Sequence, residues 1–120
     1  MSDQPAAPDD LSAEDAKLVT LARATRARAR AAEGAAVRDL DGRTYAAASV
    51  RLEHLSLSAL EVCVAMALSS GSTGLEAAVV LTDGDAPDLA ATTDFAGPGV
   101  PVLVGDPRGD IHTRHATGAD

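Results

Sequence analysis

The chain has 120 residues, the length of one domain with a single hydrophobic core. Hydrophobic residues make up 46% of it and charged residues 23%, and no apolar run approaches the roughly twenty residues of a transmembrane helix, so we expect no membrane partner. The formal net charge of −8 argues against nucleic acid as a partner, because phosphate binding requires a basic surface.

The N-terminal segment differs in composition from the rest. Residues 1–10 are acidic and contain Pro5 and Pro8, which predicts a disordered acidic tail followed by a single domain over residues 11–120. This segment lacks the basic and apolar regions of a signal peptide. Cys63 is the single cysteine, which excludes an intrachain disulfide and a zinc site built from paired cysteines. We therefore expect a cytoplasmic protein.

In chain order, the first predicted element is a helix from about Leu11 to Ala32, with Ser12 and Asp15 as a capping box at its start. Its apolar residues form one stripe at helical spacing. Arg23, Arg26 and Arg30 share the opposite face. This arginine face is either an anion site or a solvated surface whose cations suit the helix C-terminus, and we favour the second interpretation.

Gly34 is predicted to end this helix. Two strands follow, over residues 35–40 and 43–48, joined by a tight Asp41-Gly42 turn. A second helix is predicted over residues 57–70, with Gly71 as its stop. It is apolar almost all round and Glu61 is its one charged residue, so it should be buried centrally or in an interface.

The second half of the chain alternates buried strands with polar segments. An apolar run within residues 75–82 predicts a strand covered on both faces. Residues 83–99 are polar, with at most a short helix over residues 88–95, and strands are predicted over residues 100–104 and 111–114 around a turn at Asp106–Gly109. This order predicts an α/β fold, a mixed sheet of about five strands with helices on both faces.

The sequence also resembles the cytidine deaminase-like family, most closely its short actinobacterial members, over roughly residues 15–115. The family pattern runs G-A-A-L, d-G-x-x-y, C-A-E and A-x-x-x-G before a strand. The corresponding segments here are Gly34-Ala35-Ala36-Val37, Asp41-Gly42-Arg43-Thr44-Tyr45, Ser58-Ala59-Leu60, Ser69-Ser70-Gly71 and a strand ending Thr82-Asp83-Gly84-Asp85. The resemblance implies a three-layer cytidine deaminase-like sandwich.

The resemblance also implies a chemistry for the family. A zinc ion, held by a His or Cys of the first motif and two cysteines of P-C-x-x-C, activates water, and a Glu two residues after the first ligand moves protons. The first-ligand position corresponds to Ser58 and the glutamate position to Leu60. Residues 86–95, where the cysteine motif should lie, contain neither Cys nor His. We therefore expect no catalytic residue and no metal ligand.

The substrate-binding residues of the family are also replaced. The family holds ribose with an Asn and a Glu ahead of the second helix, and here Glu53 is a displaced candidate. The stacking aromatic that precedes G-A-A is replaced by alanine around Ala31 or Ala32. Other chemistry-bearing residues lack the groups needed to complete a site; these are His54, Cys63, His112, His115, the Arg108-Gly109-Asp110 turn and the lysine-free Gly71-Ser72-Thr73-Gly74 loop.

Tyr45 and Phe95 are the only aromatic residues, so the core must rely on alanine, leucine and valine. A thin core of this kind favours burial by self-association. We predict a degenerate, non-catalytic cytidine deaminase-like protein that serves as a structural or protein-interaction module. The alternative is a related hydrolase that acts on a nucleoside or other small molecule, with zinc as its cofactor if it is a deaminase. A third class is small-ligand binding without chemistry.

Overall fold

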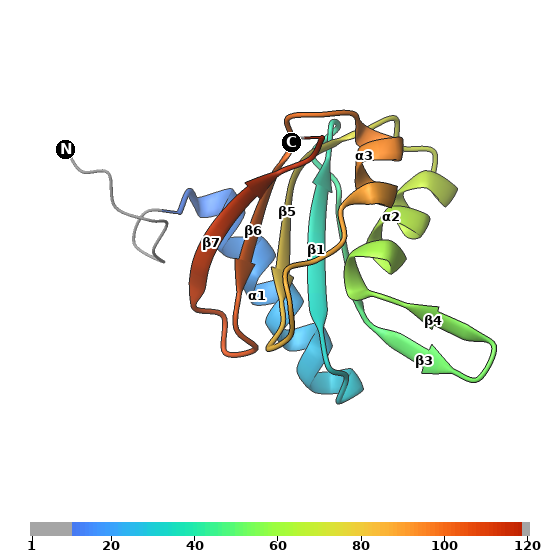
Figure 1. Cartoon of the computed structure of the whole chain (residues 1–120). Coiled ribbons are helices and arrows are strands. Elements are labelled where there is room, and N and C mark those ends of the chain that lie inside the picture. Colours follow the sequence, from blue (N-terminus) through green and yellow to red (C-terminus); the bar gives the residue numbers. More distant parts are fainter. Residues whose placement is uncertain (1–10, 119–120) are drawn as a thin grey trace.

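The computed structural model describes residues 11–118, so the predicted acidic tail over residues 1–10 lies outside the described residues. The elements follow one another from α1 to β7 (Figure 1). Their bounds are α1 Ala13–Ala29, β1 Gly34–Asp39, β2 Thr44–Ala48, β3 Val50–Leu52, β4 Leu55–Leu57, α2 Ala59–Ser69, β5 Leu75–Leu81, α3 Ala90–Ala96, β6 Pro101–Gly105 and β7 Ile111–Ala116.

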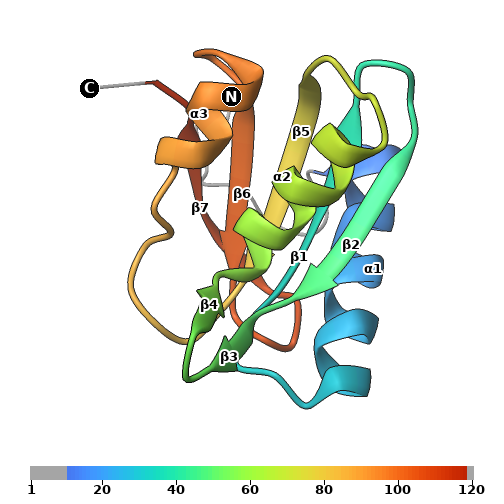
Figure 2. The same cartoon turned by 90° about the vertical axis from the view of Figure 1, so that its right-hand side faces the viewer.

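A five-stranded sheet in the order β2-β1-β5-β6-β7 forms the middle layer. Strands β5 and β6 are parallel, and the other neighbouring pairs are antiparallel. Helix α1 covers one face of the sheet, while α2 and α3 cover the other (Figures 1 and 2). The predicted α/β architecture, a mixed sheet between helical layers, is confirmed. None of the helices within residues 11–118 has the length and apolar character of a membrane span.

The core has two halves, one on each side of the sheet, because strand side chains alternate between its faces. Towards α1, the sheet packs against Leu18 and Ala22. Towards α2, it packs against a row of small and branched helix residues that includes Leu60, Cys63 and Ala67. Strand β5 is buried on both faces, as its continuous apolar run predicts.

The predicted helix stop at Gly34 is wrong. Helix α1 ends at Ala29, and Arg30 takes the left-handed cap conformation with φ 54°. Gly34 is instead the first residue of β1. A Cβ atom at Gly34 would lie 2.3 Å from the carbonyl oxygen of Ala22 and 2.7 Å from Cβ of Arg26, so glycine is required by the close approach of α1 to the sheet.

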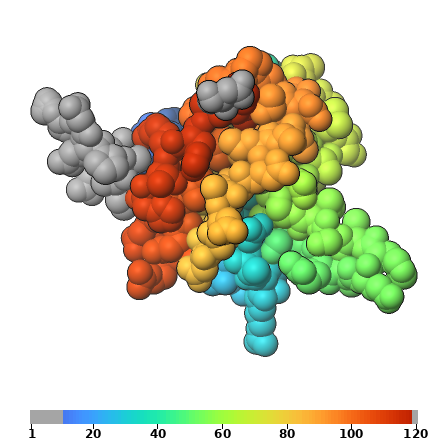
Figure 3. All heavy atoms as spheres, in the orientation of Figure 1, coloured from blue at the N-terminus to red at the C-terminus, as the bar shows by residue number. Residues whose placement is uncertain are grey.

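A hairpin that the sequence analysis does not predict lies between β2 and α2. Strands β3 and β4 pair only with each other, in the register Val50↔Leu57, Arg51↔Ser56 and Leu52↔Leu55. The hairpin projects from the body of the molecule (Figures 1 and 3). Its strands are very short, and the turn between them contains no Asn-Gly or Asp-Gly pair, which removes the usual sequence signal of a hairpin.

The hairpin also shifts the start of the second helix. The predicted range of residues 57–70 shortens to Ala59–Ser69 because Leu57 belongs to β4. The sequence predicts that this helix is buried centrally or in an interface. One face is buried in the core, whereas Met66 is 37% exposed and Leu68 is 60% exposed.

Candidate functional site

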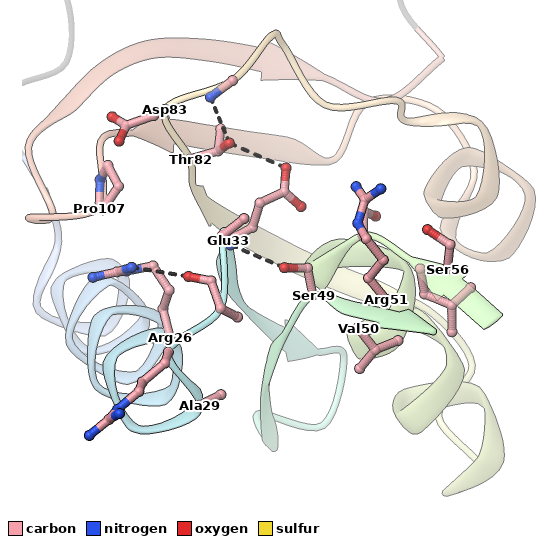
Figure 4. Close-up of a pocket in the computed structure, with 16 residues that line it drawn as sticks. Arg26, Ala29, Glu33, Ser49, Val50, Arg51, Ser56, Thr82, Asp83 and Pro107 are labelled. Atoms are coloured by element: carbon pink, nitrogen blue, oxygen red, sulfur yellow. Dashed lines mark hydrogen bonds between the residues drawn. The ribbon is translucent and has the colours of Figure 1, made fainter. Parts of the chain in front are cut away.

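A pocket of about 810 Å³ lies where the end of α1, the β3–β4 hairpin, the start of α2 and the end of β5 meet (Figure 4). Polar and charged side chains form much of its wall. They are Arg26, Arg30, Glu33, Ser49, Arg51, Ser56, Ser58, Thr82 and Asp83. We take this pocket as the candidate site because a concave surface with convergent polar groups is the usual setting for ligand binding.

Glu33 lies at the base of the pocket, in the loop between α1 and β1. Its Oε1 accepts the backbone N–H of Ala59 at 3.3 Å, and its Oε2 accepts the hydroxyl of Thr82 at 3.2 Å. The backbone N–H of Glu33 donates to Ser49 Oγ at 3.1 Å, and Thr82 Oγ1 accepts the N–H of Gly84 at 2.9 Å. The carboxylate therefore stands at the positive N-terminal end of α2 and ties three segments together.

Glu33 is not among the residues that the sequence pattern indicates. The family has an aromatic residue at the place of Ala31 or Ala32. The signal that points to Glu33 is a lone acid between a helix that ends in arginines and a strand of small residues. Nothing in that local pattern shows that the carboxylate turns towards the start of α2, 26 residues further on.

Ser58, at the position that corresponds to the family's first zinc ligand, begins α2. Its Oγ accepts the N–H of Glu61 at 3.1 Å, and Oε1 of Glu61 accepts the N–H of Ser58 at 2.8 Å, which is a complete capping box. Leu60, at the position of the catalytic glutamate, is 1% exposed and lies in the core between α2 and the sheet. Both side chains have structural roles that local packing explains.

The arginine face of α1 divides in two. Arg26 and Arg30 line the pocket, and Arg51 enters it from β3, on the other side of Glu33 in Figure 4. Nη1 of Arg26 donates to the carbonyl of Ala31 at 3.1 Å. Arg23 instead reaches the β6–β7 turn, where its Nη1 lies 3.4 Å from the carbonyl oxygen of Arg108. Arg23 and Arg30 are exposed, as a solvated face requires, whereas Arg26 is half-buried; Arg26 and Arg30 also border the cavity.

The structure places the other candidates of the sequence analysis away from this pocket. Glu53 and His54 form the hairpin turn with side chains 86% and 90% exposed. Cys63 is buried in the core, where burial raises the pKa of its thiol to about 12. His112 and His115 lie on β7. Within residues 11–118, no group of three or more His, Cys, Asp or Glu side chains is placed to hold a metal ion.

The Gly71-Ser72-Thr73-Gly74 loop has a structural role at the far end of β1. The hydroxyl of Ser72 donates to Oδ2 of the buried Asp39, whose Oδ1 accepts the backbone N–H groups of Asp41 and Arg43 at 2.9 Å each. The hydrogen bond from Ser72, with the two backbone N–H groups, lowers the pKa of Asp39. This carboxylate holds the tight Asp41-Gly42 turn, in which Gly42 has φ 86°.

The comparisons with known proteins agree with this architecture. The family model for cytidine deaminase-like proteins matches residues 11–109, and the chain therefore belongs to that family. No protein of curated function matches the chain.

Among solved structures, the cytidine deaminase of Mycobacterium leprae is similar at 18% identity with a TM-score of 0.67, over 88% of this chain and 94% of that one. The cytidine deaminase of Burkholderia pseudomallei is similar at 20% identity, also with a TM-score of 0.67, over 89% and 92%. A mutant cytidine deaminase of Mycobacterium tuberculosis is similar at 21% identity with a TM-score of 0.62, over 86% and 92%. At identities this low, the structural similarity establishes the shared fold alone.

Proposed function

We propose that this chain is a non-catalytic member of the cytidine deaminase-like family and works as a protein-interaction module that binds a second copy of itself. The observation that carries the first half of the proposal is the start of α2. There, Ser58 and Glu61 cap the helix, Leu60 packs in the core, and the carboxylate of Glu33 lies at the helix end.

The residues at the two helix starts do not fit a zinc ion. A catalytic zinc site needs three protein ligands with nitrogen, sulfur or carboxylate donors. The hydroxyl of Ser58 is engaged in the helix cap, and Leu89 and Ala90 at the start of α3 have no donor atom in their side chains. Leu60 has no proton to transfer. We therefore derive no reaction step through zinc.

Elemental analysis and a deaminase assay test this half of the proposal. We expect less than stoichiometric zinc in the purified protein and no conversion of cytidine or deoxycytidine to the uracil nucleoside. The double variant Ser58→Cys, Leu60→Glu should be equally inactive because the paired cysteines are still absent. One zinc ion per chain, or conversion by the unaltered protein that a chelator abolishes, would overturn the proposal and favour the hydrolase alternative.

The self-association half is supported by the β3–β4 hairpin. The register pairs Val50 with Leu57 and Leu52 with Leu55, so the four apolar side chains share one face of the hairpin. Val50 is 36% exposed, Leu52 68% and Leu55 48%. An isolated two-stranded hairpin is marginally stable in water. A partner that covers this apolar ladder would therefore stabilise the hairpin.

An apolar groove lies beside the hairpin on the outer face of α2. Leu57 belongs to both features, and the groove has a volume of about 440 Å³. Its walls carry no charged residue; they are Tyr45, Leu57, Val62, Ala65, Met66, Ser69 and Ser70. Because the projecting ladder and the groove are adjacent on one chain, two copies related by a two-fold axis can each place the hairpin in the other's groove. The uncharged surface also lets two strongly acidic chains approach each other.

Sedimentation velocity of the full chain at tens of micromolar tests this interface. We expect a dimer for the unaltered protein and a monomer for Leu52→Lys, because the lysine would be desolvated in an apolar contact. The matched control is Leu40→Lys, since Leu40 is 62% exposed on the β1–β2 turn and lies outside both features. A monomeric unaltered protein, or equal dissociation of both variants, would contradict the proposed interface.

A further inference from the structure

We propose that the pocket of Figure 4 binds the phosphate or carboxylate group of a small organic molecule, with Arg26, Arg30 and Arg51 as the groups that recognise it. The pocket borders the proposed dimer contact, because Val50 and Leu57 of the β3–β4 hairpin belong to both. Anion binding needs no catalytic step, and the amide titration below measures it separately from the sedimentation that tests the dimer.

The first support is the unpaired positive charge around the pocket. Within the described part of the chain, Arg26, Arg30 and Arg51 form no ion pair. Arg38, Arg43 and Arg108 each contact at least one carboxylate. Arg23, Arg28 and Arg114 have no ion pair among the described residues either, so what distinguishes Arg26, Arg30 and Arg51 is that all three line one cavity.

The second support is the way in which Arg26 is held. Its Nη1 donates to the carbonyl of Ala31 at 3.1 Å, which fixes the guanidinium at the pocket wall. Its Nε is buried and has no hydrogen-bond partner in the described structure. Buried donors are nearly always paired in folded proteins. Because this Nε has no exposed surface, the donors of Arg26 that can reach a phosphate or carboxylate oxygen are those of its Nη groups.

The carboxylates of the pocket offset only part of this charge. The two oxygens of Glu33 accept hydrogen bonds from neutral groups, the N–H of Ala59 and the hydroxyl of Thr82. Asp83 is exposed, on the Pro107 side of the pocket in Figure 4. Three cations against two carboxylates leave the pocket net positive. A volume of about 810 Å³ suits an organic molecule that carries the anion, because such pockets hold drug-sized ligands.

Titration of the full chain with two probes, followed by backbone amide NMR, tests the site. Pyrophosphate represents the phosphate source and citrate the carboxylate source. We expect at least one probe to shift the amide signals of Glu33, Ser58 and Gly84 with a Kd of about 1 mM, and added salt to weaken the binding. The probe that binds more tightly identifies the class of anion.

Matched variants separate this site from general charge effects. Arg26→Gln and Arg51→Gln should each weaken binding about fivefold or more, whereas Arg28→Gln, which removes an exposed charge outside the pocket wall, should not. Glu33→Gln removes a negative charge from the pocket and should tighten binding, while Glu14→Gln makes the same change in the first turn of α1 and should have little effect. The amide spectrum of each variant shows whether it is folded.

Two results would overturn the proposal. In one, neither probe shifts the pocket amides at about 20 mM, which is well above the expected Kd. In the other, Arg28→Gln weakens binding as much as Arg26→Gln does, which would mean that the probes respond to overall charge. Weaker binding in the folded Glu33→Gln variant would also contradict the expected sign.

Discussion

Truncation of Leu60 to alanine tests whether the position of the family's proton-transferring glutamate is now part of the core. Leu60 is 1% exposed and lies in the cluster between α2 and the sheet. Many members of that cluster are small, among them Ala35, Ala59, Cys63 and Ala67. Small side chains cannot move far enough to fill the cavity that Leu60→Ala would leave.

The expected cost follows from this packing. Buried leucine-to-alanine substitutions cost about 2–5 kcal/mol, with the larger values where the cavity persists. We therefore expect a loss of about 4 kcal/mol in the free energy of unfolding. At about 4 °C per kcal/mol for a domain of this size, Tm should fall by about 15 °C. Leu60→Glu should lower the free energy of unfolding further than Leu60→Ala, because it places an ionisable carboxyl group in an apolar core.

Chemical and thermal denaturation followed by circular dichroism measures these changes. Leu60→Met keeps the volume and should cost less than about 1.5 kcal/mol. Leu68→Ala, on the same helix but 60% exposed in the native chain, should change stability by about 0.5 kcal/mol. A free energy of unfolding for Leu60→Ala within about 1 kcal/mol of that of the unaltered protein would contradict a core role for Leu60. A folded Leu60→Glu variant with an unchanged Tm would contradict it as well.

Three further predictions concern Ser58, Asp39 and Cys63. Ser58→Ala should lower the free energy of unfolding by about 1 kcal/mol, seen by chemical denaturation, because it removes the side-chain cap of α2. The pKa of Asp39 is lowered in the folded chain by the hydrogen bond from Ser72, so its stabilisation is present above the unfolded pKa of about 4 and is lost as the pH falls through the folded pKa. Thermal melts of Asp39→Asn should therefore show a lower Tm at neutral pH and a weaker acid dependence. Burial raises the pKa of Cys63 to about 12, so the native thiol should not react with a disulfide reagent at about pH 8 and should react fully in denaturant.

Local patterns were sufficient to predict most of the elements. Ser12 caps α1, with its Oγ accepting the N–H of Asp15 at 3.0 Å, but the return bond of the predicted capping box is not formed and the Asp15 carboxylate pairs with Arg38. The apolar run in β5 and the Asp41-Gly42 turn also appear where expected, because each depends on neighbouring residues alone. The short helix α3, Ala90–Ala96, lies close to its predicted range. Strand β7 extends to Ala116, beyond the prediction, because its ladder with β6 continues to Pro101.

The position of the candidate pocket depends on tertiary packing. Arg26, Glu33, Arg51 and Thr82 come from four separate segments of the chain, and no local pattern relates them. They meet because Gly34 lets α1 approach the sheet and because the hairpin turns Arg51 towards the end of β5. The sequence alone therefore determined the family and, apart from the β3–β4 hairpin, the kinds of element and their order. Only the folded chain decided which charges share a cavity, because that depends on contacts between residues far apart in the sequence.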